Sequence, residues 1–152
     1  MPIYKAPVED VNFLLNDVFQ IDRYDNLPGF SDASADVRAV YDDIKRTRNV
    51  PDVNNFWKYL ARDPALLKRT WESVKEVMAP GALDPLVKEM LYVAVSVTNG
   101  CAYCIASHTA GARKAGMTEA MFGELMAVVG MANETNRLAN GFRVPIDPAF
   151  ME

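Results

Sequence analysis

Apolar residues recur every three or four positions along most of the chain, which is the spacing of one face of an α-helix. Cap residues and turn residues divide this pattern into separate segments, because Ser, Asp or Thr precedes several of them and Gly or Pro follows. No segment alternates as a half-buried strand does, so we expect an all-α fold. The predicted helices are Pro7–Gln20, Ala35 to a break at Arg46–Asp52, Phe56–Leu60, Pro64–Met78, Asp84–Thr98, Asn99 to Gly116, and Thr118 to Asn140.

One of these segments is open to a second interpretation. Residues 90–97, Met-Leu-Tyr-Val-Ala-Val-Ser-Val, are rich in β-formers and are also compatible with a buried strand. Length favours a helix, because no turn signal interrupts the chain from Asp84 to Thr98 and this stretch exceeds a typical strand. Asp84 followed by Pro85 is also a good helix start, and a helix that is apolar nearly all round is typical of the centre of a core.

The composition is that of a soluble globular protein, with 152 residues, 50% hydrophobic residues, 24% charged residues and a net charge of −4. One domain is expected at this length. The acidic balance argues against a nucleic-acid partner, which would require a dense basic surface. There is no apolar run that could span a membrane and no secretory signal at the start, so we expect no membrane association and a cytoplasmic location.

The rarest residues of the chain lie together. Its two cysteines and single histidine all fall between Cys101 and His108. On a helix, Cys101, Cys104 and His108 lie within an arc of about 60° and therefore share one face. Cys104 and His108 are neighbours at i and i+4, so the imidazole is able to accept the thiol proton. The helix start also favours anionic sulfur, and the pattern predicts a reactive dithiol.

Glu89 is a second candidate, because it lies in an apolar segment beside Met90 and Leu91. A carboxylate in such surroundings is costly unless it has partners. One interpretation is structural, with Glu89 bridged to a remote Lys or Arg or exposed near the helix start. The other is a partly buried base whose raised pKa suits proton transfer near neutrality.

Taken together, these residues resemble a known family. Glu89, followed twelve positions later by Cys101-Ala102-Tyr103-Cys104-Ile105-Ala106-Ser107-His108, is similar to the Glu…Cys-x-x-Cys-x-x-x-His signature of alkylhydroperoxidase D (AhpD)-like proteins, within the carboxymuconolactone decarboxylase superfamily. The likeness runs from about Asp36 to Gly141. It implies an AhpD-like helical domain, which we assign to residues 31–152. Residues 1–30 lie outside the likeness, and we expect them to form an N-terminal extension that packs one helix on the same domain.

The resemblance also implies an activity, that of a thiol peroxidase with no bound cofactor or metal. His108 would deprotonate Cys104, which attacks a hydroperoxide and becomes a sulfenic acid. Cys101 would resolve this acid by closing a disulfide, with Glu89 assisting through a water. An external dithiol reductant, lipoyl-bearing or thioredoxin-like, would complete the cycle. Some members carry a second histidine where this chain has Tyr103, so a two-histidine relay is not expected here.

Two other functions stay open at the level of the sequence. In the first, Cys101, Cys104, His108 and Glu89 hold zinc, or the cysteines act as a redox sensor. Structural zinc usually takes its ligands as two separated pairs, however, and three of these ligands would share one helix face. In the second, the chain is a carboxymuconolactone-decarboxylase-type enzyme, although such members do not need a Cys-x-x-Cys pair.

The apolar surface of two predicted helices bears on assembly. Residues 90–97 and 122–131 carry more apolar side chains than one small helical core is expected to cover. A symmetric homo-oligomer is therefore expected, and the family resemblance implies a trimer or hexamer.

Overall fold

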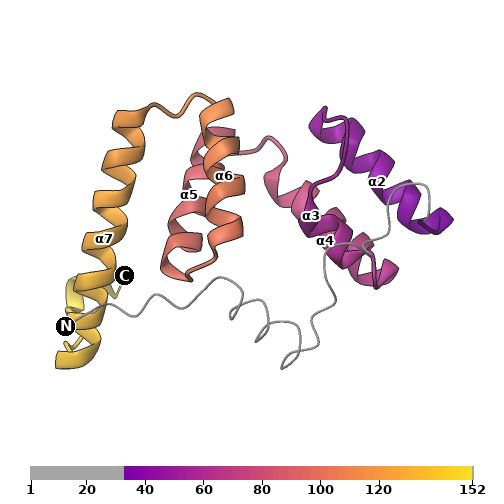
Figure 1. Ribbon diagram of the computed structural model, residues 1–152. Coiled ribbons are helices and arrows are strands. Elements are labelled where there is room, and N and C mark those ends of the chain that lie inside the picture. Colours follow the sequence, from indigo (N-terminus) through magenta and orange to yellow (C-terminus); the bar gives the residue numbers. More distant parts are fainter. Residues whose placement is uncertain (1–32, 152) are drawn as a thin grey trace, which may run out of the picture. The chain divides into compact units, whose positions relative to one another are not determined.

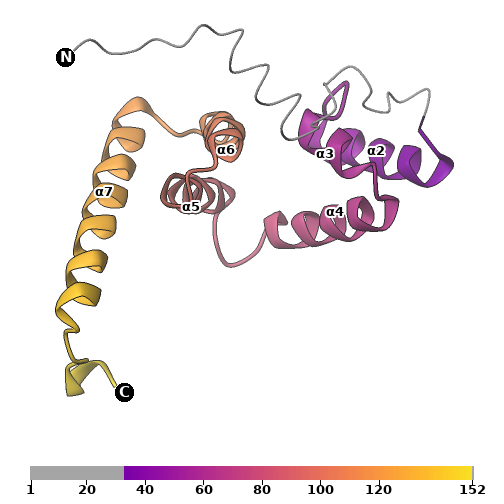
Figure 2. The same cartoon turned by 60° about the horizontal axis from the view of Figure 1, so that its bottom comes forward.

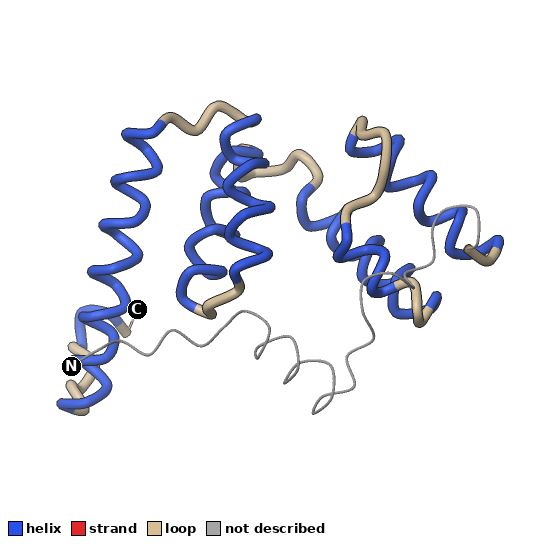
Figure 3. Tube along the Cα trace, in the orientation of Figure 1, coloured by secondary structure: helices blue, strands red, loops and turns tan. Residues whose placement is uncertain are grey.

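The computed structural model describes residues 33–151, and these residues form helices and connecting loops without a strand (Figures 1 and 3). The all-α prediction is therefore confirmed. The predicted helix at 7–20 and the predicted boundary at residues 30 and 31 lie outside the described residues. The helices are α2 (Ala35–Arg48), α3 (Asn55–Leu60), α4 (Pro64–Met78), α5 (Pro85–Thr98), α6 (Ala102–Lys114) and α7 (Glu119–Phe142), followed by the short 3₁₀ helix η3 (Pro148–Phe150).

Two predicted helix ends were wrong by a few residues. Helix α2 continues to Arg48 and does not break at Arg46, because basic residues in its last turn interact favourably with the helix dipole. Asn49, with φ of 51°, takes the left-handed conformation that ends the helix. Helix α7 continues through Asn140 and Gly141 to Phe142, since the left-handed position falls on Arg143. Both helices thus end where the backbone turns left-handed.

The ambiguous segment at 90–97 belongs to helix α5, as its length predicted. The Asp84 side chain caps this helix by accepting a hydrogen bond from the backbone N–H of Leu86 at 2.8 Å, and Pro85 occupies the first turn. The local start signal therefore outweighed the β-rich composition of the helix interior.

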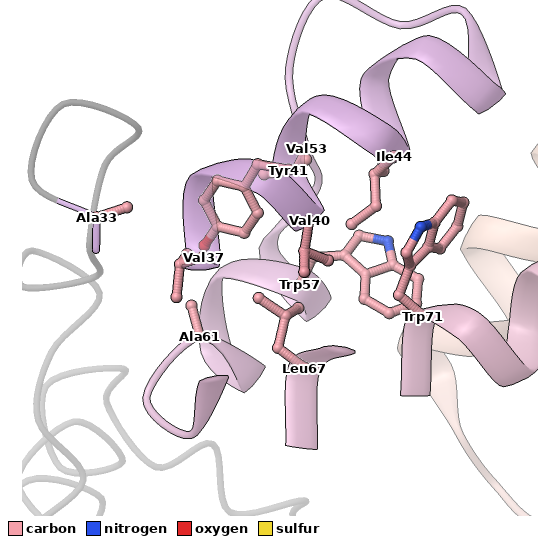
Figure 4. Close-up of a cluster of buried hydrophobic side chains, with 10 residues drawn as sticks. All are labelled: Ala33, Val37, Val40, Tyr41, Ile44, Val53, Trp57, Ala61, Leu67 and Trp71. Atoms are coloured by element: carbon pink, nitrogen blue, oxygen red, sulfur yellow. The ribbon is translucent and has the colours of Figure 1, made fainter. Parts of the chain in front are cut away.

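The chain divides into two compact units, the first reaching Val77 and the second running from Met78 to Glu152. In the first unit, α2, α3 and α4 enclose a hydrophobic core (Figure 4). The indole rings of Trp57 and Trp71 meet edge to face at 5.4 Å between centroids, and Leu67 is fully buried. This core consists of Ala33, Val37, Val40, Tyr41, Ile44, Val53, Trp57, Ala61, Leu67 and Trp71.

A polar contact ties α2 to α4 beside this core. The Oδ2 atom of Asp43 accepts hydrogen bonds from Nε1 of Trp71 at 2.7 Å and from Nζ of Lys75 at 2.6 Å, while Oδ1 accepts one from Arg46. Hydrogen bonds from Lys75 and then Trp71 lower the pKa of Asp43 to about 2, because they stabilise its charged form. We call Asp43, Trp71 and Lys75 the Asp43 clamp.

The second unit is built on a pair of antiparallel helices. A tight connection through Gly100, whose φ is 68°, returns the chain so that α6 lies alongside α5 (Figure 2). Helix α7 packs more sparsely against α5. Val93 and Ser96 of α5 and Thr109 and Ala112 of α6 are the buried residues of this pair. The arrangement brings Glu89 of α5 beside His108 of α6, two of the predicted site residues. Within the described residues, no helix combines the length and apolar character needed to cross a membrane.

Candidate active site

The two cysteines lie at the start of α6 and form a disulfide. Cys101 is the N-cap residue and Cys104 lies in the first turn, so the helix start holds the pair together. The backbone N–H of Cys104 donates to Sγ of Cys101 at 3.3 Å. The predicted helix included Cys101, whereas α6 begins one residue later, at Ala102. Cys101 therefore satisfies a backbone N–H that the helix leaves without a partner, as an N-cap does.

Glu89 and His108 meet across the α5–α6 pair. Oε2 of Glu89 lies 2.7 Å from Nδ1 of His108, although 19 positions separate them along the chain. Their side chains are 22% and 18% exposed, so the contact is mostly shielded from water but not sealed. A carboxylate only accepts hydrogen bonds, so Nδ1 of His108 carries the proton and Nε2 is the ring nitrogen that can receive another.

His108 is also held by an aromatic ring. The Tyr92 ring stacks on the imidazole with 3.8 Å between centroids and 16° between planes. Tyr92 follows Glu89 by three positions on α5, so both side chains project from one face toward α6. Glu89 and Tyr92 thus fix the orientation of the ring from two directions. The sequence interpretation missed Tyr92, and its only signal was this spacing from Glu89.

All four predicted site residues therefore lie in the second unit, on two adjacent helices. Cys101 is the N-cap of α6, Cys104 and His108 lie in the first half of that helix, and Glu89 faces His108 from α5. The structure brings Glu89 to His108 and joins the two sulfurs, while the catalytic roles stay predictions. Among residues 33–151, no group of three His, Cys, Asp or Glu side chains is arranged to hold a metal ion.

The structure thus places a disulfide at a helix start, with a histidine hydrogen-bonded to a carboxylate one turn further on, which is an arrangement suited to thiol/disulfide chemistry. Comparison with known proteins makes this more specific. Residues 64–147 match the Carboxymuconolactone decarboxylase family, and this match covers more than half of the chain. The protein belongs to that family, as its sequence motif predicted.

A solved structure narrows the relationship further. The chain is similar to the crystal structure of the alkylhydroperoxidase AhpD core from Rhodospirillum rubrum, with 55% sequence identity and a TM-score of 0.75. The similarity covers 77% of this chain and 87% of that one. The AhpD-like fold expected from the Glu89-to-His108 motif is therefore confirmed.

One curated relative matches over a shorter stretch. The "uncharacterized protein 4 in cox locus" of Paracoccus denitrificans is 46% identical over 44 residues. This stretch is 29% of the present chain and 40% of the relative, so the match spans less than half of that protein. The name of that relative states no activity.

Proposed function

We propose that the protein is a thiol peroxidase of the alkylhydroperoxidase type, which reduces hydroperoxides through Cys101 and Cys104. The observation that supports this most strongly is the position of the Cys101–Cys104 disulfide, one helical turn from a histidine that hydrogen-bonds Glu89 at 2.7 Å. The similarity to an alkylhydroperoxidase AhpD core adds independent support.

The first step of the proposed cycle consumes the peroxide. In the reduced protein, Nε2 of His108 takes the thiol proton of Cys104, its neighbour at i−4. The thiolate attacks the terminal oxygen of the hydroperoxide, the O–O bond breaks, and the alkoxide leaves with the proton held by His108. The products are an alcohol and a sulfenic acid on Cys104. Glu89 stabilises the imidazolium that exists between these two proton transfers.

The second step closes the disulfide. The thiol of Cys101 attacks the sulfur of the sulfenic acid, and the hydroxyl group leaves as water with the proton of that thiol. The short spacing at the start of α6 favours this reaction, because the fold accommodates a bond between these two sulfurs. An external dithiol, lipoyl-bearing or thioredoxin-like, then returns both cysteines to thiols and is itself oxidised to a disulfide.

The proposed assembly is a homo-oligomer. Val87, Leu91 and Val95 follow one another at intervals of four along α5, and all three side chains are exposed. Helix α7 adds exposed Val128 and Met131. A second copy of the chain is the proposed partner for this apolar surface. Light scattering at micromolar concentration should give the mass of a trimer or hexamer, and a monomer mass would contradict the proposal.

Peroxide consumption by purified, reduced protein tests the proposed activity. With a dithiol such as dihydrolipoamide in excess, the protein should consume cumene hydroperoxide catalytically, and without reductant it should consume one equivalent per pair of thiols. The same sample should be assayed for zinc. Two thiols that stay reduced in peroxide, with one zinc bound per chain, would overturn the proposal in favour of a metal site.

A further inference from the structure

Gly111 lies directly against the carboxyl group of Glu89. A Cβ atom placed on Gly111 would be 2.9 Å from Cδ and from Oε2 of Glu89 and 3.1 Å from its Oε1. These are the three nearest heavy atoms to that position, and two of the distances are shorter than real Cβ contacts. The space occupied by the Glu89 carboxylate therefore exists because residue 111 has no side chain.

The other helical glycines show that this contact is specific to one position. At Gly123, Gly130 and Gly141 of α7, an added Cβ atom would meet nothing within 4 Å beyond its own stretch of helix. Glycine in a helix interior is less favourable than alanine, so a glycine inside α6 has an energetic cost. Gly111 follows His108 by three positions and lies on the same face of the helix. The hydrogen bond between Glu89 and His108 provides a reason for this glycine.

We propose that Gly111 is a positioning residue, whose missing side chain makes the space in which Glu89 binds Nδ1 of His108. The inference rests on the proposed function only where it connects this geometry with peroxide reduction. The steric and hydrogen-bonding part concerns the folded protein whether or not it turns over peroxide.

The expected effect of a side chain at this position is local. The atoms that a Cβ would meet belong to the far end of a flexible side chain, so the carboxylate can move without disturbing the backbone of α5. That movement takes the acceptor away from Nδ1 of His108, which is 2.7 Å distant in the present arrangement. An imidazole without such a partner carries its proton mainly on Nε2 when neutral. Nε2 is then no longer free to accept the Cys104 proton.

The tautomer of His108 can be measured directly, because it is the single histidine of the chain. The experiment uses the oxidised, tag-free protein at alkaline pH and records the ¹⁵N shifts of the ring by NMR. We expect the Nδ1–H tautomer in the natural protein and a shift toward Nε2–H in Gly111→Ala. Gly130→Ala is the matched control, since it adds the same methyl group to a helix interior where nothing lies nearby, and should leave the tautomer unchanged.

A double variant separates the clash with Glu89 from other effects. In a Glu89→Ala background, the three atoms nearest to the added methyl group are gone, so Gly111→Ala should cause no further change in tautomer. If Gly111→Ala fails to fold while the double variant folds, the clash with Glu89 is still established. If both fail to fold while Glu89→Ala alone folds, residue 111 is needed for packing alone and the proposal is wrong.

Turnover supplies the second readout. Gly111→Ala should reduce peroxide turnover about tenfold, as expected when a proton acceptor is misaligned, and Gly130→Ala should not. An inactive natural protein whose tautomer responds as described would refute the proposed function and support the positioning role. An active protein in which Gly111→Ala changes neither tautomer nor turnover would refute the positioning role alone.

Discussion

The two units of the chain differ in how they use their buried groups. In residues 33–77, the described part of the first unit, ten hydrophobic residues pack into one core, and the Asp43 clamp lies beside it. In the described part of the second unit, the buried hydrophobic residues are Val93, Ala112, Met117 and Val129. Glu89, Cys101, Cys104 and His108 are among the half-buried residues of this unit. The larger buried apolar core therefore lies in the first unit and the candidate site in the second.

The two units contain different residues that can serve as spectroscopic probes. Both tryptophans of the chain, Trp57 and Trp71, belong to the first unit, whereas both cysteines and the single histidine belong to the second. Tryptophan fluorescence therefore reports on the first unit, and the NMR signal of His108 reports on the site. A change made in one unit can be followed in both.

The largest effect is expected from the core of the first unit. Leu67 is fully buried, so Leu67→Ala should lower the free energy of unfolding by about 2–5 kcal/mol through lost burial and the cavity left behind. Urea unfolding followed by tryptophan fluorescence measures this loss. The His108 tautomer of the folded variant should match that of the natural protein. A changed tautomer would show that the site depends on the core of the first unit, which would contradict the separation of the core from the site.

A change at the site in the second unit should lower peroxide turnover and leave the unfolding of the first unit unchanged. Glu89→Gln keeps an acceptor for Nδ1 of His108 but removes the negative charge that stabilises the imidazolium. Peroxide turnover should fall at least about tenfold, which corresponds to about 1.4 kcal/mol, while the tryptophan-monitored unfolding midpoint stays the same.

Glu124→Gln is the matched control for this change, because Glu124 is an exposed residue of α7. It should alter neither turnover nor unfolding. Full activity in a folded Glu89→Gln protein would assign Glu89 to packing and leave His108 as the base without a charged partner.

The smallest effect is expected from the Asp43 clamp, and it depends on pH. The pKa of Asp43 lies at about 2 and below its ordinary value of 3.8, so the ionised carboxylate stabilises the folded state. This stabilisation is complete above pH 3.8 and disappears as the pH falls through about 2. At pH 6, Asp43→Asn should lower the free energy of unfolding by about 1 kcal/mol.

Comparison across pH is the decisive part of this test. The difference between the natural protein and Asp43→Asn should shrink between pH 4 and pH 2, measured by tryptophan fluorescence in urea. Asp42→Asn is the control, since the exposed carboxylate of Asp42 pairs with Lys45 at 2.9 Å at the surface, and surface pairs contribute little to stability. A difference that is constant with pH would mean that the Asp43 charge does not stabilise the fold.

The features that could be predicted from the sequence are those set by residues close together in the chain. The spacing of Cys104 and His108 is a local property of one helix, and the cap at Asp84 likewise predicts the start of α5. The β-rich stretch at 90–97 could still be assigned because its length favoured a helix. Local signals therefore gave the fold class and the residues on α6.

The features that could not be predicted depend on how α5 meets α6. Glu89 attracted attention as a carboxylate in an apolar segment, but its contact with His108 requires two helices to pack in a particular register. The stacking of Tyr92 and the space left by Gly111 arise from the same packing. Helix ends near Arg46 and Asn140 were misplaced because left-handed residues further along, Asn49 and Arg143, determine them.

The central claim is that Cys104 attacks the peroxide, with His108 as the proton acceptor and Glu89 as the group that stabilises the imidazolium. Cys101 is the competing nucleophile, because it is the N-cap of α6 and a helix start stabilises anionic sulfur. The most direct measurement treats reduced Cys101→Ser and Cys104→Ser proteins with one equivalent of cumene hydroperoxide and dimedone, followed by mass spectrometry. We predict a dimedone adduct on Cys104 in Cys101→Ser, and no adduct in Cys104→Ser. An adduct on Cys101 alone, or on neither cysteine, would contradict the account.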